Sequence, residues 1–411
     1  MRALAVAVAI LLLVGAGAPA AQDWPQFRGP TGQGISADNR VPLEWSETRN
    51  VIWKTPVAGR GWSSPVVAGG RVWITSAVAS GGSTSLRVMG FDAATGAGLV
   101  DVELFRIRRD QTTTNPKNSD ASPTPIVEAD RVYVHFGSNG TAAVTTAGEI
   151  VWKTRFEYES QHGSGGSPVL YRDLLIINCD GFDSPFVVAL DKRTGRAKWR
   201  RVRRMPWSQA YSTPLVVRAG DADQVVSVGA SFTVALDPLT GREIWRVGYP
   251  DGFSNVPRPV FGDGLVFVTT GFQQPSLLAV RVDGRDDVSR THVAWALTRG
   301  VPHTPSPILV GDELYIVSDL GVATCLDART GAPHWVERLG GNYSASPVYA
   351  GARIYFTSEE GVTTVIAPGT TFTRLATSVL DGTMLASPAV SDGSFFVRTD
   401  GHLYRLGESA R

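Results

Sequence analysis

The sequence predicts an all-β protein, an eight-bladed β-propeller built from four-stranded antiparallel blades. The first observation behind this prediction is a short phrase, usually Ser or Thr followed by Pro and an apolar run, that recurs eight times. The prolines of this phrase are Pro65, Pro123, Pro168, Pro214, Pro259, Pro307, Pro347 and Pro388, spaced from 40 residues (307 to 347) to 58 residues (65 to 123). A period of about 45 residues is typical of a propeller with one blade per repeat.

The second observation is the pattern of short apolar segments inside each repeat. In the sixth repeat, residues 306–310 form an apolar run, 313–318 alternate around Leu and Ile, and 322–326 form a third segment. A fourth segment begins at 334–336, after a turn at 327–331. Strands of four to six residues separated by turn signals predict an antiparallel meander of four strands.

The third observation is an Asp-x-x-Thr-Gly turn followed four residues later by Trp. Asp suits such a turn because its carboxylate accepts backbone N–H groups, and Gly tolerates the positive φ that closes it. A Trp at this place predicts an outer strand whose indole packs between neighbouring blades. The structural motif residues are Asp191, Gly195, Trp199, Asp237, Gly241, Trp245, Asp327, Gly331 and Trp335.

The two ends of the chain predict how the ring closes. The eighth repeat stops one strand short, whereas residues 51–57 have an outer-strand pattern but precede the first Ser-Pro. We therefore expect an N-terminal strand to complete the last blade and to remove the exposed sheet edges. The predicted organisation is a signal peptide at 1–20, an N-terminal strap at 21–50 and the propeller at 51–408.

Charge, hydropathy and cysteine content restrict the class of partner. The chain carries 39 basic and 38 acidic residues, so there is no electrostatic case for nucleic acid as a partner. No later stretch reaches transmembrane length, and no Cys stands at the predicted cleavage site to carry a lipid. The two cysteines, Cys179 and Cys325, follow or precede apolar runs and predict buried free thiols. We expect a periplasmic or secreted monomer.

The repeated Leu-Asp-x-x-Thr-Gly-x-x-x-Trp phrase resembles the pyrroloquinoline quinone (PQQ) repeat. Residues 188–199 and 235–245 are close examples, and the resemblance covers the mature chain. One branch of this family, the quinoprotein dehydrogenases, holds PQQ and calcium over the axis beside a disulfide of adjacent cysteines. The chain has no adjacent cysteines and more closely resembles the non-catalytic branch of BamB-type propellers. The resemblance thus implies a propeller with no cofactor. Separately, residues 23–30 resemble the start of exported relatives.

The segments that precede each inner strand are expected to gather around the axis on one face. Their more variable positions carry hydrogen-bonding and aromatic side chains with a single carboxylate, a composition that suits an extended peptide or a glycan-like ligand and not a metal ion. Ordinary solvent-exposed loops remain the alternative interpretation. The candidate ligand-binding residues are Arg60, Trp62, Asn118, Asp120, His162, Gln209, Tyr211, Asn255, His303, Asn342 and Tyr343.

These observations lead to two functional hypotheses. The first is an exported, non-catalytic propeller that acts as a binding or scaffold module for protein or other macromolecular partners. The alternative is a quinoprotein-like oxidoreductase that binds PQQ and calcium over the axis. The axial segments carry neither a nucleophile motif nor paired carboxylates, so they do not indicate a hydrolase.

A cluster of basic residues flanks the outer strand of the third repeat. It consists of Arg196, Lys198, Arg200, Arg201, Arg203 and Arg204. The cluster predicts either an outer edge strand protected by charge or a docking patch for an anionic partner.

Overall fold

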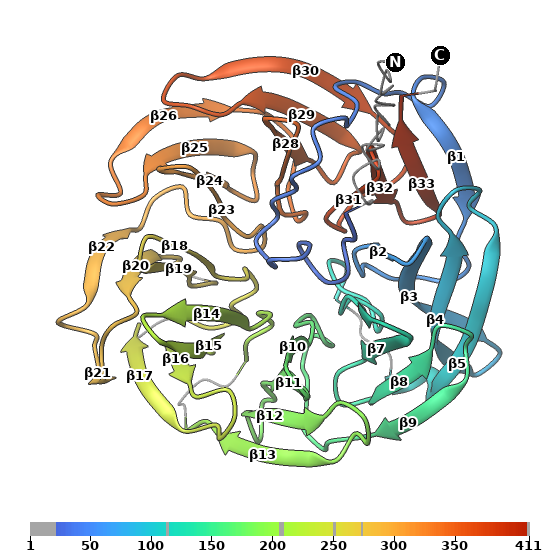
Figure 1. Ribbon diagram of the computed structural model, residues 1–411, viewed down its shortest axis with the longest axis horizontal. Helices are drawn as coiled ribbons and strands as arrows, with labels where there is room; N and C mark the ends of the chain where they lie inside the picture. Colours follow the sequence, from blue (N-terminus) through green and yellow to red (C-terminus); the bar gives the residue numbers. More distant parts are fainter. Residues whose placement is uncertain (1–21, 112–114, 205–208, 250–251, 273, 409–411) are drawn as a thin grey trace, which may run out of the picture.

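The computed structural model describes residues 22–408 except 112–114, 205–208, 250–251 and 273. The predicted signal peptide at 1–20 lies outside the described residues. Within them, 33 strands form eight mainly antiparallel sheets around one axis, together with one 3-10 helix, η1 (Arg109–Gln111) (Figure 1). The predicted eight-bladed, all-β propeller is confirmed.

Every blade runs from a short inner strand through two central strands to an outer strand. Blade 1 contains β2 (Val66–Ala68), β3 (Arg71–Ser80), β4 (Ser83–Asp92) and β5 (Gly98–Arg108), and blade 2 contains β6 (Ile126–Glu128), β7 (Arg131–His135), β8 (Thr141–Thr145) and β9 (Ile150–Thr154). Blade 3 contains β10 (Val169–Tyr171), β11 (Leu174–Cys179), β12 (Phe186–Asp191) and β13 (Ala197–Val202), and blade 4 contains β14 (Leu215–Ala219), β15 (Ala222–Val228), β16 (Phe232–Leu236), β17 (Glu243–Gly248) and the added β21 (Asp286–Asp287).

The remaining four blades follow the same order. Blade 5 contains β18 (Val260–Gly262), β19 (Leu265–Thr269), β20 (Leu277–Arg281) and β22 (Val293–Leu297), and blade 6 contains β23 (Ile308–Val310), β24 (Glu313–Val317), β25 (Val322–Asp327) and β26 (Pro333–Arg338). Blade 7 contains β27 (Val348–Ala350), β28 (Arg353–Thr357), β29 (Val362–Ala367) and β30 (Thr373–Val379), and blade 8 contains β31 (Ala389–Ser391), β32 (Ser394–Arg398), β33 (His402–Gly407) and β1 (Val51–Pro56).

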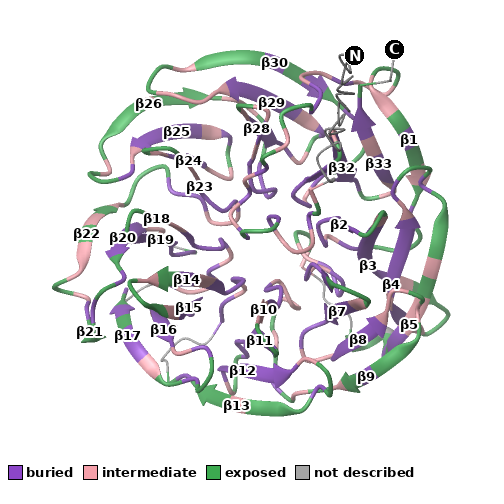
Figure 2. Ribbon diagram, in the orientation of Figure 1, coloured by how far each residue is buried: buried purple, intermediate pink, exposed green. Residues whose placement is uncertain are grey.

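The hydrophobic core lies between the blades. All six residues of β11 and all six of β12 are buried, because each central strand packs against a neighbouring blade on both of its faces. Outer strands such as β13 and β26 are largely exposed, and Figure 2 shows this change from buried inner strands to an exposed rim.

The second repeat begins two residues later than the sequence pattern predicts. The residue that follows the repeated Pro starts the inner strand in the other seven blades, as Val66 follows Pro65. In blade 2 the inner strand starts at Ile126, so the equivalent phrase is Thr124-Pro125 and not Ser122-Pro123. Two consecutive Ser/Thr-Pro phrases in Ser122-Pro123-Thr124-Pro125 caused the error. The hydrogen bonds described next decide between them.

A ring of hydrogen bonds joins the inner strands around the axis. The backbone N–H of the residue before each repeated Pro donates to the side-chain hydroxyl of the equivalent residue in the next blade. Seven such bonds of 2.9–3.1 Å link Ser64 to Thr124, Thr124 to Ser167, Ser167 to Thr213, Arg258 to Ser306, Ser306 to Ser346, Ser346 to Ser387 and Ser387 to Ser64. At the eighth place Arg258 offers no hydroxyl, and its Nε donates to Pro214 O at 3.1 Å.

Outer-strand tryptophans connect five blades to the turn of the next. Trp199 of blade 3 donates through Nε1 to Pro238 O in the turn of blade 4, and Trp152, Trp295, Trp335 and Trp53 make equivalent bonds. The turn glycine lies directly under the indole: a Cβ at Gly241 would come within 2.6 Å of the Trp199 ring. Because glycine has no Cβ, it can adopt the positive φ of 69° at this position and also leaves room for the neighbouring Trp ring.

Blade 4 differs from the others by a fifth strand. The long connection between β20 and β22 contributes β21, which pairs in parallel with β17 through Trp245 and Asp286. This extra strand covers Trp245, which is fully buried and donates to Gln224 Oε1 at 2.9 Å within its own blade. Trp245 thus occupies the motif position without making the bond to the next blade.

The ring closes as the sequence predicts. β1 pairs antiparallel with β33, with Thr55 opposite Leu403 and Lys54 opposite Tyr404. The first strand of the propeller therefore completes the last blade, and no blade in the described part of the chain is left with three strands. Closure joins residues more than 340 positions apart in sequence.

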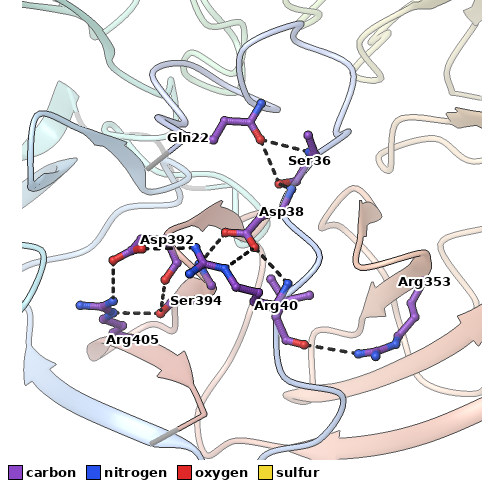
Figure 3. Close-up of polar contacts among 11 residues, drawn as sticks. Gln22, Ser36, Asp38, Arg40, Arg353, Asp392, Ser394 and Arg405 are labelled. Carbon is purple, nitrogen blue, oxygen red and sulfur yellow. Dashed lines mark hydrogen bonds and ion pairs between the residues drawn. The ribbon is translucent and has the colours of Figure 1, made fainter. Parts of the chain in front are cut away.

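The segment after residue 21 forms a strap over one face. It leads toward the centre of the ring in Figure 1 and bonds to the inner strands of blades 1, 2 and 7 through Trp24, Pro25 and Gly34. Its later part lies on blades 7 and 8, where Arg40 contacts Asp38 and Asp392 and Arg353 donates to Val41 O (Figure 3). Trp24 and Trp45 are buried by these contacts.

The hydroxyl ring predicts a measurable contribution to stability. Ser346→Ala removes the acceptor of the buried Ser306 amide, and leaving such a donor unsatisfied costs about 1–3 kcal/mol. Chemical denaturation should show this loss in the free energy of unfolding. The exposed Ser80→Ala, which removes a hydroxyl outside the ring, is the matched control and should lie within about 0.5 kcal/mol of wild type. Equal values for both variants would contradict the role of the ring.

His135 predicts an acid-dependent loss of stability. It is buried at the end of β7, and burial lowers its pKa from 6.5 to about 3, so it stays neutral in the folded protein. The unfolded chain binds the proton first, so stability is complete above pH 6.5 and falls as pH drops from 6.5 toward 3, by at most about 1.4 kcal/mol per pH unit. His135→Gln should flatten this slope in denaturation curves across pH 4–7, whereas the exposed His334→Gln should not.

Candidate functional site

A cleft of about 540 Å³ opens near the propeller axis, on the face of the ring opposite the strap. Five successive connections between blades, from blade 1–2 to blade 5–6, supply its walls. Two turns between central strands, in blades 5 and 6, add to them. The lining residues are Asn115, Lys117, Asn118, Gln161, His162, Gly165, Gln209, Tyr211, Phe253, Ser254, Val256, Phe272, His303, Thr304 and Asp319.

The opposite placement of cleft and strap follows from strand direction. Connections that enter an inner strand lie at one end of it, and the turn that leaves the inner strand lies at the other end. The cleft is built from the entering connections, whereas the backbone of the strap pairs with the backbone of Val67, Val127, Tyr349 and Gly351, at or after the middle of the inner strands. The two ends of the axis therefore have different surroundings.

One wall of the cleft is formed by Tyr211, His162 and Gln209. The rings of His162 and Tyr211 are tilted with centroids 6.2 Å apart, and Gly165 lets the Tyr211 side chain lie against the chain. Burial raises the pKa of Tyr211 to about 12, so its hydroxyl stays protonated at neutral pH. Gln209 Nε2 donates to Gln161 Oε1, and Asn118 Nδ2 donates to the backbone oxygen of His162. This wall presents a phenol, an imidazole and amides.

The facing wall is aromatic. Phe253 and Phe272 meet edge to face at 5.7 Å, and Phe272 meets His303 edge to face at 6.4 Å. The position of His303 is set by its backbone N–H, which donates to Asp319 Oδ2 at 2.6 Å. A carboxylate from the turn of blade 6 thereby orients a connection that comes from blade 5.

Large apolar side chains stand exposed on the turns between central strands. Phe182 in blade 3 is 63% exposed, Phe272 in blade 5 is 54% exposed, and Leu320 in blade 6 is 69% exposed. Each stands beside a glycine in its turn, and Phe272 also lines the cleft. Exposed aromatic and aliphatic side chains beside a cleft are a feature of interaction sites.

The structure brings five of the eleven candidate residues together in this cleft: Asn118, His162, Gln209, Tyr211 and His303. Arg60 and Trp62 lie outside it, with the Arg60 guanidinium 5.8 Å from the Trp62 ring and bonded to Pro116 O. Asp120 is buried. They do not line the cleft.

Three further candidates serve the fold. Asn255 is fully buried, donates to Gly229 O and accepts from the Gly271 amide, so its side chain joins the central turns of blades 4 and 5. Tyr343 is buried in the core between blades 6 and 7. Asn342 is exposed, donates to Glu360 Oε1 at 2.8 Å and is not among the residues that line the cleft.

Sequence reasoning missed Phe272 and Asp319 because it considered only the connections that enter inner strands. Both residues belong to turns between central strands. A signal was available in the sequence: Gly181-Phe182, Gly271-Phe272 and Leu320-Gly321 each place a large apolar residue beside Gly in a turn, where apolar side chains are not needed for packing.

A family model described as outer membrane protein assembly factor BamB matches residues 36–164, 106–231 and 276–371, which together cover most of the propeller. The chain belongs to this family. A curated relative, outer membrane protein assembly factor BamB of Burkholderia pseudomallei (strain K96243), is 25% identical over 261 residues. The match covers 54% of this chain and 57% of the relative, so the chain matches little more than half the length of that protein.

Solved structures show the same fold. BamB from Moraxella catarrhalis superposes with a TM-score of 0.62 at 14% identity, covering 88% of this chain and 98% of that one. Quinohemoprotein alcohol dehydrogenase from Comamonas testosteroni gives a TM-score of 0.67 at 12% identity, covering 95% of this chain and 81% of that one. At these identities the likeness concerns the propeller architecture alone.

The residues of this BamB-family chain do not fit a calcium-bound quinone site. Ca²⁺ takes six to eight oxygen ligands, usually with several carboxylates. No three His, Cys, Asp or Glu side chains gather as a metal site among the described residues. Asp319 holds the His303 amide, and Glu359 beside the cleft is engaged by Lys117 and Ser344. Cys179 and Cys325 are free thiols in different blades.

The basic cluster of the third repeat is divided in the structure. Arg203 points inward, is fully buried and pairs with Asp180 at 3.0 Å, also bonding to Asn178. Arg200 lies over the Phe186 ring, and Arg201 pairs with Glu243 of blade 4 at 2.9 Å. These contacts connect blades 3 and 4 or protect an outer strand, and they leave no single surface formed by all six residues.

Proposed function

We propose that this protein is an exported, non-catalytic binding propeller that holds an extended segment of a protein partner in the cleft. The observation that carries the proposal is the aromatic wall of Phe253, Phe272 and His303 beside exposed apolar turns. Membership of the BamB family, whose name describes assembly of outer membrane proteins, supports a protein as the partner.

The physical argument rests on the mixture of groups in the cleft. Covering partly exposed aromatic rings with a partner makes the free energy of binding more favourable, because apolar area leaves water. The Tyr211 phenol, the His162 imidazole and nearby amides can pair with the peptide groups of an extended chain. A cleft bordered by five successive connections offers both kinds of contact along its length. A glycan-like ligand stays a prediction that the same experiments test.

We further propose that the protein works outside the cytoplasm as a monomer. The leader-like segment at 1–20 and the family to which the chain belongs support export to the periplasm or beyond. Each blade has its own set of four or five strands among the described residues, so no blade needs a strand from a second copy to be complete. No helix in the described ranges is long and apolar enough to cross a membrane.

The proposal predicts that the cleft, and not the rim, holds the partner. Phe272→Ala combined with His303→Ala should reduce partner recovery at least tenfold in affinity capture from the native envelope, since it removes two contacting rings. Leu239→Ala combined with His334→Ala removes one exposed apolar side chain and one exposed imidazole from blades 4 and 6 outside the cleft, and should leave recovery unchanged. Recovery equal to wild type with both double variants would contradict a cleft-based function.

The absence of cofactor chemistry is a separate prediction. Purified protein incubated with PQQ and Ca²⁺ should elute from gel filtration without quinone absorbance, because no three His, Cys, Asp or Glu side chains gather as a metal site among the described residues. The control is a quinoprotein dehydrogenase treated in parallel. Retained, stoichiometric PQQ would favour the quinoprotein-like oxidoreductase instead.

A further inference from the structure

Two arginines meet at the axis on the strap side of the ring. Arg28 belongs to the strap and is 2% exposed, and Arg258 belongs to blade 5 and is 1% exposed. Arg258 donates to Pro214 O of blade 4 and, through Nη1 at 2.6 Å, to Phe27 O of the strap. Arg28 Nη2 reaches Pro347 O of blade 7 at 3.5 Å. Only the axis lies within reach of blades 4, 5 and 7 at once.

Neither guanidinium has a counter-charge. No carboxylate in the described part of the chain pairs with Arg28 or Arg258. Burial lowers the pKa of each to about 9, and the like charge of Arg258 adds to the effect on Arg28. Both groups therefore remain cations at neutral pH. A buried cation without a partner is costly, since its hydration is lost and nothing replaces it.

The hydrogen bonds leave Arg28 unsatisfied. Its Nε and Nη1 atoms are buried and make no hydrogen bond within the described residues. Arg398, an equally buried arginine elsewhere in the ring, also has an unpaired Nε within the described residues, but the fold surrounds its Nη1 with oxygens: Nη1 donates to Ser63 O, Ser63 Oγ and Thr75 O. Arg28 has only the long contact to Pro347.

The space beside these groups is small. Cβ atoms at Gly32 and Gly34 would come within 2.5 Å of Arg258 Nη1 and 2.7 Å of Arg28 Nη2, so the strap backbone lies directly against the guanidinium groups. Both glycines have positive φ. A bulky carboxylate or phosphate ester has no room to enter from the strap, whereas a monatomic anion needs little.

We propose that the axial end of the strap is an anion site, in which Arg28 and Arg258 hold a small monovalent inorganic anion of chloride size. The anion supplies the counter-charge that the chain lacks and accepts from the free Arg28 donors. It thereby links the strap to the inner strands. Arg258 occupies the position before the repeated Pro, where the other seven blades carry Ser or Thr. Blade 5 therefore has a positive charge in place of a hydroxyl in the ring of hydrogen bonds.

The first test is anion-dependent stability. Melting of the full chain is followed as sodium chloride replaces sodium gluconate at constant ionic strength, gluconate being too large for the site. Saturating chloride should raise the Tm of wild type by about 2–4 °C. Arg258→Ser, which restores the phrase of the other blades, and Arg28→Gln should each abolish the shift. Arg218→Ser, which removes an exposed arginine of blade 4, should keep it.

The second test locates the ion directly. Crystals of wild type grown in sodium bromide should show an anomalous peak against Arg28 and Arg258, absent in the Arg28→Gln variant. The proposal is overturned if wild type shows no chloride-specific shift, if both arginine variants keep the shift, or if the crystals contain only water at these nitrogens. Should Arg258→Ser fail to fold, Arg28→Gln and the bromide peak of wild type still decide.

Discussion

The hydrogen bond from the amide before each repeated Pro to the hydroxyl of the next blade is the contact on which the ring depends. Pro holds the residue before it in an extended conformation, which fixes the direction in which that residue presents its amide and its side chain. Each Ser or Thr can then donate to one neighbour and accept from the other. Because the bond from Ser387 to Ser64 returns to the first blade, every blade must keep the same register for the ring to close.

The same register determines what lies at each end of the axis. When the inner strands are aligned by their hydroxyls, all the connections that enter them gather on one face, and all the turns that leave them gather on the other. The strap uses the second face, where inner strands such as β2 and β27 offer free backbone groups to Trp24 and Gly34. The first face keeps its connections exposed, and the cleft forms there.

The fold could be predicted because its determinants repeat. The Pro phrase, the Asp-x-x-Thr-Gly turn and the outer Trp each recur, so an irregular copy does not hide the period. In blade 2 the sequence offers two Pro phrases, Ser122-Pro123 and Thr124-Pro125. Only the hydrogen bonds of Thr124 with Ser64 and Ser167 show that the second phrase is the true repeat. The site was predicted less completely, because loop side chains have no period: Asn255 and Tyr343 turned inward, and Phe272 came from a turn that the pattern does not mark.

Recognition and stability are thus separated along the axis. On the strap side, the buried residues Arg28, Arg258 and Trp24 bond to blades 7, 4 and 1 respectively, so a change there disturbs register and closure together. On the cleft side, Phe272 and His303 touch each other and the solvent, and the hydroxyl ring beneath them carries the register. Side chains around the cleft can therefore change without loosening the ring, which is the condition under which one scaffold can take different partners.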